Sequence, residues 1–267
     1  MQATRHYTLD AYNCYVEQAD SIMLVNDLLT QLTGVLNLNP VMPPFILPYY
    51  YCEDPDDGGI SAFCLCANGS HITIHTFPYR SCFFVDILTD QYFVEAEVNS
   101  LISKLIYAGT MKSKVVDRRD FTQTYADIDT EYDFGPHYMI TLDNIDTTFE
   151  KIYKWLDRIA PKINMTPITR PYVIYDKIED PNYISGILVV AQSHIAFHYS
   201  IKEKKANLDI FSCSFLDNDV VENIIKDTFG TTAMCNLVVR GSKHVIKSQQ
   251  HSRASRNELY KKWRNNI

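Results

Sequence analysis

A repeated segment constrains the fold of this chain more than any other feature of its sequence. The stretches Ile60–Asp90 and Tyr183–Cys213 both contain Ser-His-Ile, a second histidine four residues after the first, and an Asp-Ile pair that begins sixteen residues after the serine. The matched residues are Ser70, His71, His75 and Asp86 in the first stretch and Ser193, His194, His198 and Asp209 in the second. The chain is therefore predicted to be a tandem duplication, with its chemistry on the repeated β-hairpin.

The elements around this hairpin also recur in the same order. Each half begins with a strand-like segment, continues with apolar residues at helical spacing, and has a second amphipathic helix after the hairpin. These ranges are His6–Cys14, Glu17–Leu36 and Tyr92–Ala108 in the first half, and His137–Asp143, Asp146–Ile159 and Asn218–Phe229 in the second. We expect an α+β fold in which each half is a mainly antiparallel sheet with helices on one face. The two halves would pack as an internal pseudo-dimer.

The order of the elements also predicts domain boundaries. Residues 1–108 form the first repeat and residues 136–241 the second. The polar segment 109–135 between them is interpreted as a surface linker. Residues 242–267 form a basic tail, which we interpret as a solvated terminal segment.

Composition excludes several classes of protein. The net charge of −7 argues against a nucleic-acid partner, and no run of about 18 apolar residues is present to span a membrane. The N-terminus lacks the basic and apolar regions of a secretory signal, which favours a cytoplasmic location. The seven cysteines include no CxxC pair, so we expect reduced thiols and no zinc site.

Three interpretations of the Ser–His hairpin follow from its residues alone: a metal site, a serine hydrolase and a polar strand face. The two histidines of each hairpin share a strand face but stand about 13 Å apart, too far to hold one ion. A serine hydrolase is disfavoured because no GxSxG motif is present and the serine lies well inside a predicted strand. The remaining interpretation is a polar outer face of a half-buried strand, and the exact repetition of the pattern argues against it.

The stretch ANGSHITIHTFPYRSCFFVDI resembles the signature of the bacterial and archaeal S-adenosylmethionine decarboxylases. That family has a Glu-Ser-His motif, an Ile-His-Thr-Trp-Pro-Glu run, and then Val-Asp. RHYTLDAYNC is similar to the start of the family, and ISGILVVAQSH matches its Val-Ser-Gly run before the motif. The resemblance covers most of both halves.

The resemblance implies a self-processing, pyruvoyl-dependent lyase without a metal. In the family, a serine attacks the preceding carbonyl, and β-elimination and hydrolysis leave a pyruvoyl group at the new N-terminus. That group forms a Schiff base with S-adenosylmethionine and accepts electrons during decarboxylation. The product is the aminopropyl donor of polyamine (spermidine) synthesis.

Matching positions assign roles to residues of this chain. Ser193 is the pyruvoyl precursor, with cleavage between Gln192 and Ser193, and Cys213 is the proton donor. The intact site would join these residues of the second repeat to two from the first. The residues that assist cleavage are Ser61 and His75, with Ser185 and His198 at the equivalent positions of the second repeat. The substrate-binding residues are Phe77 and Tyr79. The degenerate second site contains Ser70 and Asp90.

The chain also departs from the family pattern. Gln192 and Gly69 replace the glutamate before each serine, while Tyr79 and Lys202 replace the glutamate that binds the ribose. These changes leave open a pyruvoyl decarboxylase for arginine or ornithine, an unprocessed regulatory partner, or other S-adenosylmethionine chemistry at an uncleaved site. Cys213 favours catalysis, whereas the loss of glutamate before Ser193 favours the regulator. Further pairing into a homodimer is also open.

Overall fold

The computed structural model describes residues 4–49, 58–120, 123–129, 133–213, 215–230 and 233–242. The first repeat begins with strand β1 and two helices, and a third helix precedes its last strand. Its elements are β1 (Arg5–Cys14), α1 (Val16–Ala19), α2 (Ile22–Val35), β2 (Phe45–Tyr49), β3 (Gly59–Cys66), β4 (Ser70–Phe77), β5 (Cys82–Thr89), α3 (Glu95–Leu105) and β6 (Ala108–Asp117).

The second repeat follows the same plan, preceded by a short additional strand. Its elements are β7 (Thr124–Tyr125), β8 (Asp133–Leu142), α4 (Phe149–Lys162), β9 (Tyr172–Tyr175), β10 (Tyr183–Val190), β11 (Ser193–Ser200), β12 (Lys205–Phe211), α5 (Asn218–Phe229) and β13 (Ala233–Ser242). None of the helices within the described ranges has the length and apolar character needed to cross a membrane.

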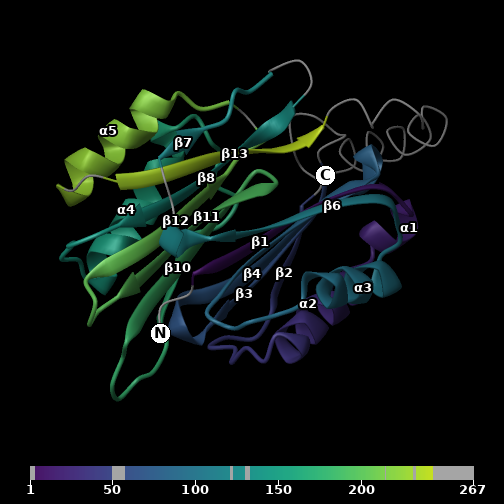
Figure 1. Ribbon diagram of the computed structural model, residues 1–267, viewed down its shortest axis with the longest axis horizontal. Helices are drawn as coiled ribbons and strands as arrows, with labels where there is room; N and C mark the ends of the chain where they lie inside the picture. The colour runs from purple at the N-terminus through teal and green to yellow at the C-terminus, as the bar shows by residue number, and fades with distance from the viewer. Residues whose placement is uncertain are drawn as a thin grey trace, which may run out of the picture.

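Each repeat forms one sheet, and the two sheets pack face to face. The strand order is β2-β3-β4-β5-β1-β6 in the first sheet and β7-β13-β8-β12-β11-β10-β9 in the second. Apart from the short β7–β13 pair, which is parallel, the paired strands are antiparallel. The helices lie on the outer face of each sheet (Figure 1). This arrangement confirms the predicted α+β fold of two repeated halves.

Alternation along the strands separates two kinds of core. On β4, Ile72 and Ile74 face the helices and join the apolar cluster of the first repeat, while His71 and His75 face the second sheet. The second repeat has an equivalent apolar cluster beneath α4 and α5. The helix-facing cores are therefore apolar, and the interface between the sheets holds buried polar side chains.

Helix boundaries follow from capping residues. Ser21 Oγ accepts a hydrogen bond from Leu24 N at 3.3 Å and begins α2, so the predicted helical stretch Glu17–Leu36 is divided into α1 and α2. Helix α5 matches its predicted range, beginning after Asp217 and ending before Gly230, which has a φ of 65°.

Two sequence expectations about the chain between elements need correction. The predicted linker 109–135 is shorter than expected, because β6 occupies its first part and pairs with β1 along its length. The predicted two-stranded hairpin contains a third strand, since a turn at Ala191–Gln192 separates β10 from β11. Neither residue of this turn is Gly, Pro, Asn or Asp, so the sequence carries no conventional turn signal there. Apart from Ser242, the last residue of β13, the predicted tail 242–267 lies outside the described residues.

Candidate active site

The bond between Gln192 and Ser193 lies at the turn that joins β10 to β11. Gln192 has a φ of 53°, in the left-handed region that residues other than glycine adopt uncommonly. Ser193 is the first residue of β11 and is fully buried, and its hydroxyl has no hydrogen-bond partner among the described residues. The expectation that this serine lies well inside a strand is therefore wrong, because the residue before it belongs to a turn.

Ser61 and His75 of the first repeat meet this turn across the sheet interface. They lie opposite each other on β3 and β4, and Ser61 Oγ is 3.0 Å from His75 Nδ1 and 3.1 Å from Gln192 Oε1. Gln192 Nε2 donates to Tyr49 O at 2.9 Å, which leaves Oε1 as an acceptor. Ser61 must then donate to Gln192, and His75 must donate its Nδ1 proton to Ser61. The structure thus brings the predicted Ser61–His75 pair to the residue before Ser193.

Two histidine pairs connect the sheets at this interface. His75 Nε2 lies 2.9 Å from His194 Nδ1, and His71 Nδ1 lies 2.7 Å from His198 Nε2. On its other side, His198 Nδ1 is 2.9 Å from Ser185 Oγ, which reproduces the Ser61–His75 contact in the second repeat. No partner was predicted for His71 or His194. The repeated SHxxxH spacing was the available signal, because two such strands that face each other can pair both histidines.

Burial sets the protonation of these four histidines, each at most 1 % exposed. Loss of hydration lowers the pKa of His194 to about 4 and that of His198 to about 3. The same cause places the pKa values of His71 and His75 well below the usual value. A neutral imidazole donates from one nitrogen and accepts at the other, so His75, which donates from Nδ1 to Ser61, accepts from His194 at Nε2.

Cys213 follows β12 and lies on the other side of the same turn. Its thiol donates to Ala191 O at 3.7 Å, and its side chain is half-buried. Gly135 on β8 permits this position, because a Cβ there would overlap Ser212 O and approach Cys213 Cα. The predicted proton donor therefore lies beside the predicted cleavage site.

An aromatic cluster fills the space between the sheets next to Cys213. Its buried members are the aromatic residues Tyr12, Phe77, Phe84, Phe134 and Phe211, together with Cys82. Phe77, one of the two predicted substrate-binding residues, is fully buried and contacts Phe84 and Phe134 edge-on, with ring centroids 5.6 and 5.1 Å apart. Tyr79, the other predicted substrate residue, is half-buried in a single helical turn, Pro78–Arg80. In this conformation the Phe77 ring is covered by protein side chains and presents no open stacking surface.

The equivalent site of the other repeat is built differently. Ser70 is fully buried, and Asp90, at the position equivalent to Cys213, accepts a hydrogen bond from Asn68 Nδ2 at 3.0 Å. A Cβ at Gly69 would lie only 3.1 Å from the Tyr183 ring, and Gly69 has a φ of 70°. A side chain like that of Gln192 therefore does not fit before Ser70 without movement of Tyr183.

A buried ionic network at the centre of the interface was not predicted. Arg240 of β13 donates to Asp86 of the first repeat, lies 3.1 Å from His137 Nδ1, and donates from Nε to Asp10 at 2.6 Å. Burial alone would raise the pKa of Asp86, but Arg240 and His137 hold it well below its usual range. The repeated Val-Val segments that end in arginine were the sequence signal for this network.

The pseudo-symmetric half of the network uses Arg118. This guanidinium donates to Asp209 of the second repeat and lies 3.0 Å from His6 Nδ1. Each arginine thus binds an aspartate of the other repeat and a histidine of its own. The network links the two halves through paired charges, and such buried pairs are strongly position-specific because each charge needs its partner.

Three side chains of this network could in principle hold a metal ion. Ligand atoms of His6, Asp86 and His137 lie within 4.8 Å of one another. Arg240 already donates to Asp86 and contacts His137, so a second cation there would meet a fixed positive charge. These residues do not fit a metal site.

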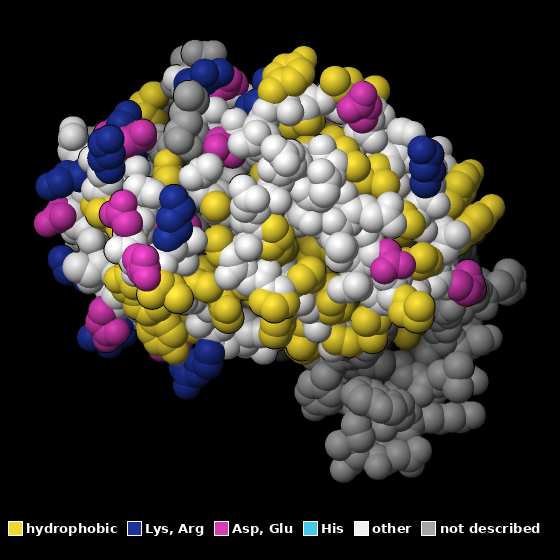
Figure 2. All heavy atoms as spheres, turned by 90° about the horizontal axis from the view of Figure 1, so that it is seen from below, with side chains coloured by type: hydrophobic (Ala, Val, Ile, Leu, Met, Phe, Trp, Pro, Cys, Tyr) yellow, Lys and Arg dark blue, Asp and Glu magenta, His cyan; other side chains and the backbone are white. Residues whose placement is uncertain are grey.

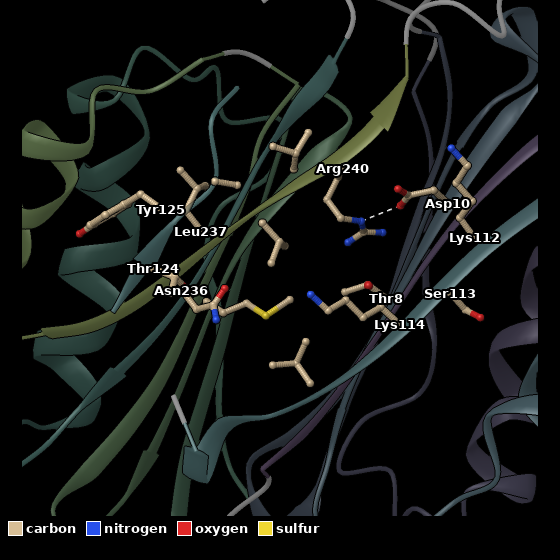
Figure 3. A pocket seen from close by; sticks show the side chains of 15 residues that line it. Thr8, Asp10, Lys112, Ser113, Lys114, Thr124, Tyr125, Asn236, Leu237 and Arg240 are labelled. Carbon is tan, nitrogen blue, oxygen red and sulfur yellow. Dashed lines mark hydrogen bonds and ion pairs between the residues drawn. The ribbon is translucent and has the colours of Figure 1, made fainter. Parts of the chain in front are cut away.

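An open cleft lies between the sheets on the side of β6 and β13 (Figure 3). Its volume is about 480 Å³, and its charged lining residues are Asp10, Lys112, Lys114 and Arg240. In Figure 3, Lys114 points into the space between the sheets and Arg240 points towards Asp10. Neither Ser193 nor Cys213 lines this cleft. The predicted catalytic residues and this cleft are thus separate features of the interface.

Comparison with known proteins gives one family match. The model of the family described as S-adenosylmethionine decarboxylase matches residues 5–119 and 137–240, which together make up most of the chain. The solved adenosylmethionine decarboxylase of Aquifex aeolicus VF5 is 18 % identical over 48 % of this chain and all of that chain, with a TM-score of 0.36. An unknown protein from Galdieria sulphuraria is 8 % identical over 89 % of this chain and all of that chain, with a TM-score of 0.21. No curated protein sequence matches.

Proposed function

Because this chain belongs to the S-adenosylmethionine decarboxylase family, we propose that it is a pyruvoyl-dependent S-adenosylmethionine decarboxylase that cleaves itself between Gln192 and Ser193. Its product would supply the aminopropyl group for spermidine synthesis in the cytoplasm. The chain would need no second copy to complete its site, because the two repeats supply both sets of residues.

The single observation that carries this proposal is the contact of Ser61 with Gln192. It places a Ser–His pair from one repeat against the residue whose carbonyl Ser193 would attack. Ser193 has a buried hydroxyl without a partner among the described residues, so no hydrogen bond within them competes with attack on the Gln192 carbonyl. His75 is neutral and held by His194, and its Nδ1 proton orients Ser61 as a hydrogen-bond donor to Gln192.

The residues around Ser193 also fit the group that self-cleavage would leave. When formed from Ser193, a pyruvoyl group supplies the carbonyl that accepts electrons as the substrate loses CO2. Cys213 lies beside the same turn and would deliver a proton to the substrate carbon. The neighbouring aromatic cluster would exclude water from this step.

Intact-mass spectrometry tests the proposal directly. Wild-type protein should give two fragments divided at Gln192–Ser193, with a pyruvoyl group on the C-terminal fragment, and Ser193→Ala should stay whole. A single mass of 30.8 kDa for the wild type would overturn the decarboxylase proposal. A division at Gly69–Ser70 would mean that the other repeat holds the active serine.

A second candidate function is an unprocessed homologue that regulates or binds another protein. Burial of the site favours it: Ser61, His75, Gln192 and Ser193 are each at most 1 % exposed, and Phe77 is covered by other rings. The glutamine before Ser193 favours it as well. A chain that stays whole and releases no CO2 from S-adenosylmethionine would support this candidate.

A third candidate keeps the chemistry but changes the substrate. Tyr79 stands where the family has the ribose-binding glutamate, and a buried site without that carboxylate leaves the ribose hydroxyls unpaired. If the chain is cleaved, assays of labelled CO2 release from S-adenosylmethionine, arginine and ornithine would identify the substrate.

A further inference from the structure

The side chain of Gln192 holds the turn between β10 and β11 to the first repeat by both ends of its amide. Nε2 donates to Tyr49 O at 2.9 Å, and Oε1 lies 3.1 Å from Ser61 Oγ. Tyr49 is the last residue of β2, the edge strand of the first sheet, and Ser61 belongs to the neighbouring strand β3. One side chain of the second repeat therefore bonds two strands of the first.

The orientation of this amide is fixed by its partner on β2. A backbone carbonyl oxygen only accepts hydrogen bonds, so the amide nitrogen must face Tyr49 O and the amide oxygen must face Ser61. Ser61 therefore donates to Gln192 and accepts from His75. His194 in turn donates to His75 at the start of the chain of bonds. The bonds thus run in one direction, from His194 to Tyr49 O.

An ionised glutamate would not fit in place of Gln192. Both oxygens of a carboxylate are acceptors, so one of them would face Tyr49 O with no proton between the two atoms. Gln192 is 1 % exposed, so a charge on its side chain would also lose its hydration. An amide has the same shape as a carboxylate and supplies the donor that this position needs.

The described groups that face this amide from β2, β3, β4 and β11 are neutral. On β2 and β3 they are the backbone oxygen of Tyr49 and the hydroxyl of Ser61. His75 on β4 and His194 on β11 are uncharged because burial lowers their pKa values. Every histidine among the described residues is at most 1 % exposed, and no histidine side chain is seen on the face of the molecule in Figure 2.

The charged groups that act on His75 belong to the central ionic network. Arg240 on β13 and Asp86 on β5 act on it with opposite signs, and the guanidinium donates to the carboxylate. On the other side of the turn, the thiol of Cys213 donates to a backbone oxygen of the turn itself. The described surroundings of Gln192 therefore favour a neutral side chain.

The equivalent turn of the first repeat lacks this anchor. Gly69 stands in place of Gln192 and has the same left-handed conformation, with a φ of 70° against 53°. Glycine adopts this conformation freely, whereas glutamine does so at a cost that its side-chain hydrogen bonds offset. Because Gly69 has no side chain, the equivalent chain of bonds ends at Ser185, which contacts His198. Of the two turns, the one proposed to be cleaved is held by an amide.

We infer that Gln192 is a positioning residue for self-cleavage and that this chain needs a neutral amide at this position, where the family has glutamate. The inference rests on the proposed function. The amide holds the turn against the first repeat and fixes the direction in which Ser61 donates. The reacting atoms belong to the backbone carbonyl of Gln192 and the hydroxyl of Ser193. If glutamine were a degenerate substitution, glutamate would instead speed cleavage.

Two variants of Gln192 test this inference by their cleavage rates relative to the wild type at the same pH. Full-length chains are made by cell-free synthesis, and gel densitometry and intact mass follow their division at residues 192 and 193. Gln192→Met keeps the length of the side chain but neither hydrogen bond, so cleavage should be about 100-fold slower at every pH.

Gln192→Glu should depend on pH in a way that a merely structural role would not produce. Burial without a neighbouring cation raises the pKa of a carboxyl above its usual value of about 4.3. At about pH 8.5 the carboxylate should slow cleavage as much as methionine does. At about pH 6 the protonated carboxyl can donate to Tyr49 O and accept from Ser61, so the relative rate should approach that of the wild type.

Gln18→Glu is the matched control. Gln18 Oε1 accepts from Tyr107 N at 2.7 Å, and a carboxylate oxygen can do the same, so this variant should cleave like the wild type at both pH values. Circular dichroism at both pH values checks that the variants are folded. A Gln192→Glu chain that cleaves as fast as the wild type at the higher pH, or equally slowly at both, would overturn the inference alone. A wild type that stays whole would overturn the proposed function as well.

Discussion

Ser61 Oγ lies 3.1 Å from Gln192 Oε1, although the two residues belong to different repeats and stand 131 positions apart. The contact makes the candidate site a property of the pair of sheets, since neither repeat contains it alone. His75 and His194 extend it by one further hydrogen bond across the interface. A duplicated chain can assemble such a site in one molecule, where a single repeat would need a partner.

The pseudo-symmetry supplies a matched control for the role of Ser61. Under the proposed function, Ser61→Ala removes the hydroxyl between His75 and Gln192 and should slow self-cleavage by about 100-fold, a typical loss for one positioned hydrogen-bond donor. Ser185→Ala removes the equivalent hydroxyl from the other repeat and should leave cleavage at Gln192–Ser193 unchanged. Gel densitometry of the fragments over time measures both rates. Equal slowing by both variants would contradict a specific role for Ser61.

Arg240 should be among the side chains on which stability depends most. Arg240→Met leaves Asp86 and Asp10 without their guanidinium partner inside the interface, so we expect a loss of about 3–5 kcal/mol in the free energy of unfolding. The control is Arg119→Met, because Arg119 forms an exposed ion pair with Asp117 and should contribute at most about 1 kcal/mol. Urea unfolding followed by circular dichroism measures both. Similar losses for the two variants would show that the buried network adds no more than a surface pair.

Gly135 should control the position of Cys213. Gly135→Ala places a Cβ against Ser212 O, so β8 or the segment after β12 must move. We expect a loss of about 1–3 kcal/mol in stability from this overpacking. Gly34→Ala in α2 is the control, because a Cβ there meets nothing within 4 Å and alanine favours helix, so its stability should be unchanged or higher. Thermal unfolding compares the two, and an unchanged midpoint for Gly135→Ala would show that the segment adjusts freely.

The sequence predicted the repeat, the two antiparallel sheets and the helical faces because each depends on local periodicity. The alternation in β4 shows which residues face the other sheet, as His71 and His75 do. The proximity of Ser61 to the second repeat was predicted from the family resemblance, because periodicity carries no information about how one sheet is positioned on another.

The remaining features depend on contacts between distant segments. Arg240 and Asp86 are 154 positions apart, and no local pattern pairs them. The turn at Gln192 has no glycine to mark it, and the burial of Phe77 follows from rings contributed by other strands. A sequence pattern gives the chemical type of each residue, whereas these outcomes depend on how closely the sheets pack.

Acid should destabilise this fold well before its carboxylates titrate. Burial lowers the pKa values of His6 and His194 to about 4 and that of His198 to about 3, whereas unfolded histidine titrates near its model value of 6.5. Between pH 6.5 and 4 the unfolded chain therefore binds more protons, so stability falls as the pH is lowered through this window. At pH 5 each of these histidines should lower the free energy of unfolding by about 2 kcal/mol. The sum over the three histidines approaches the stability of a typical domain. Urea unfolding at about pH 7.5, 6.5, 5.5 and 5, which spans this window, measures the change in the free energy of unfolding. A free energy of unfolding that stays constant down to pH 5 would mean that these histidines are protonated or hydrated in the folded protein.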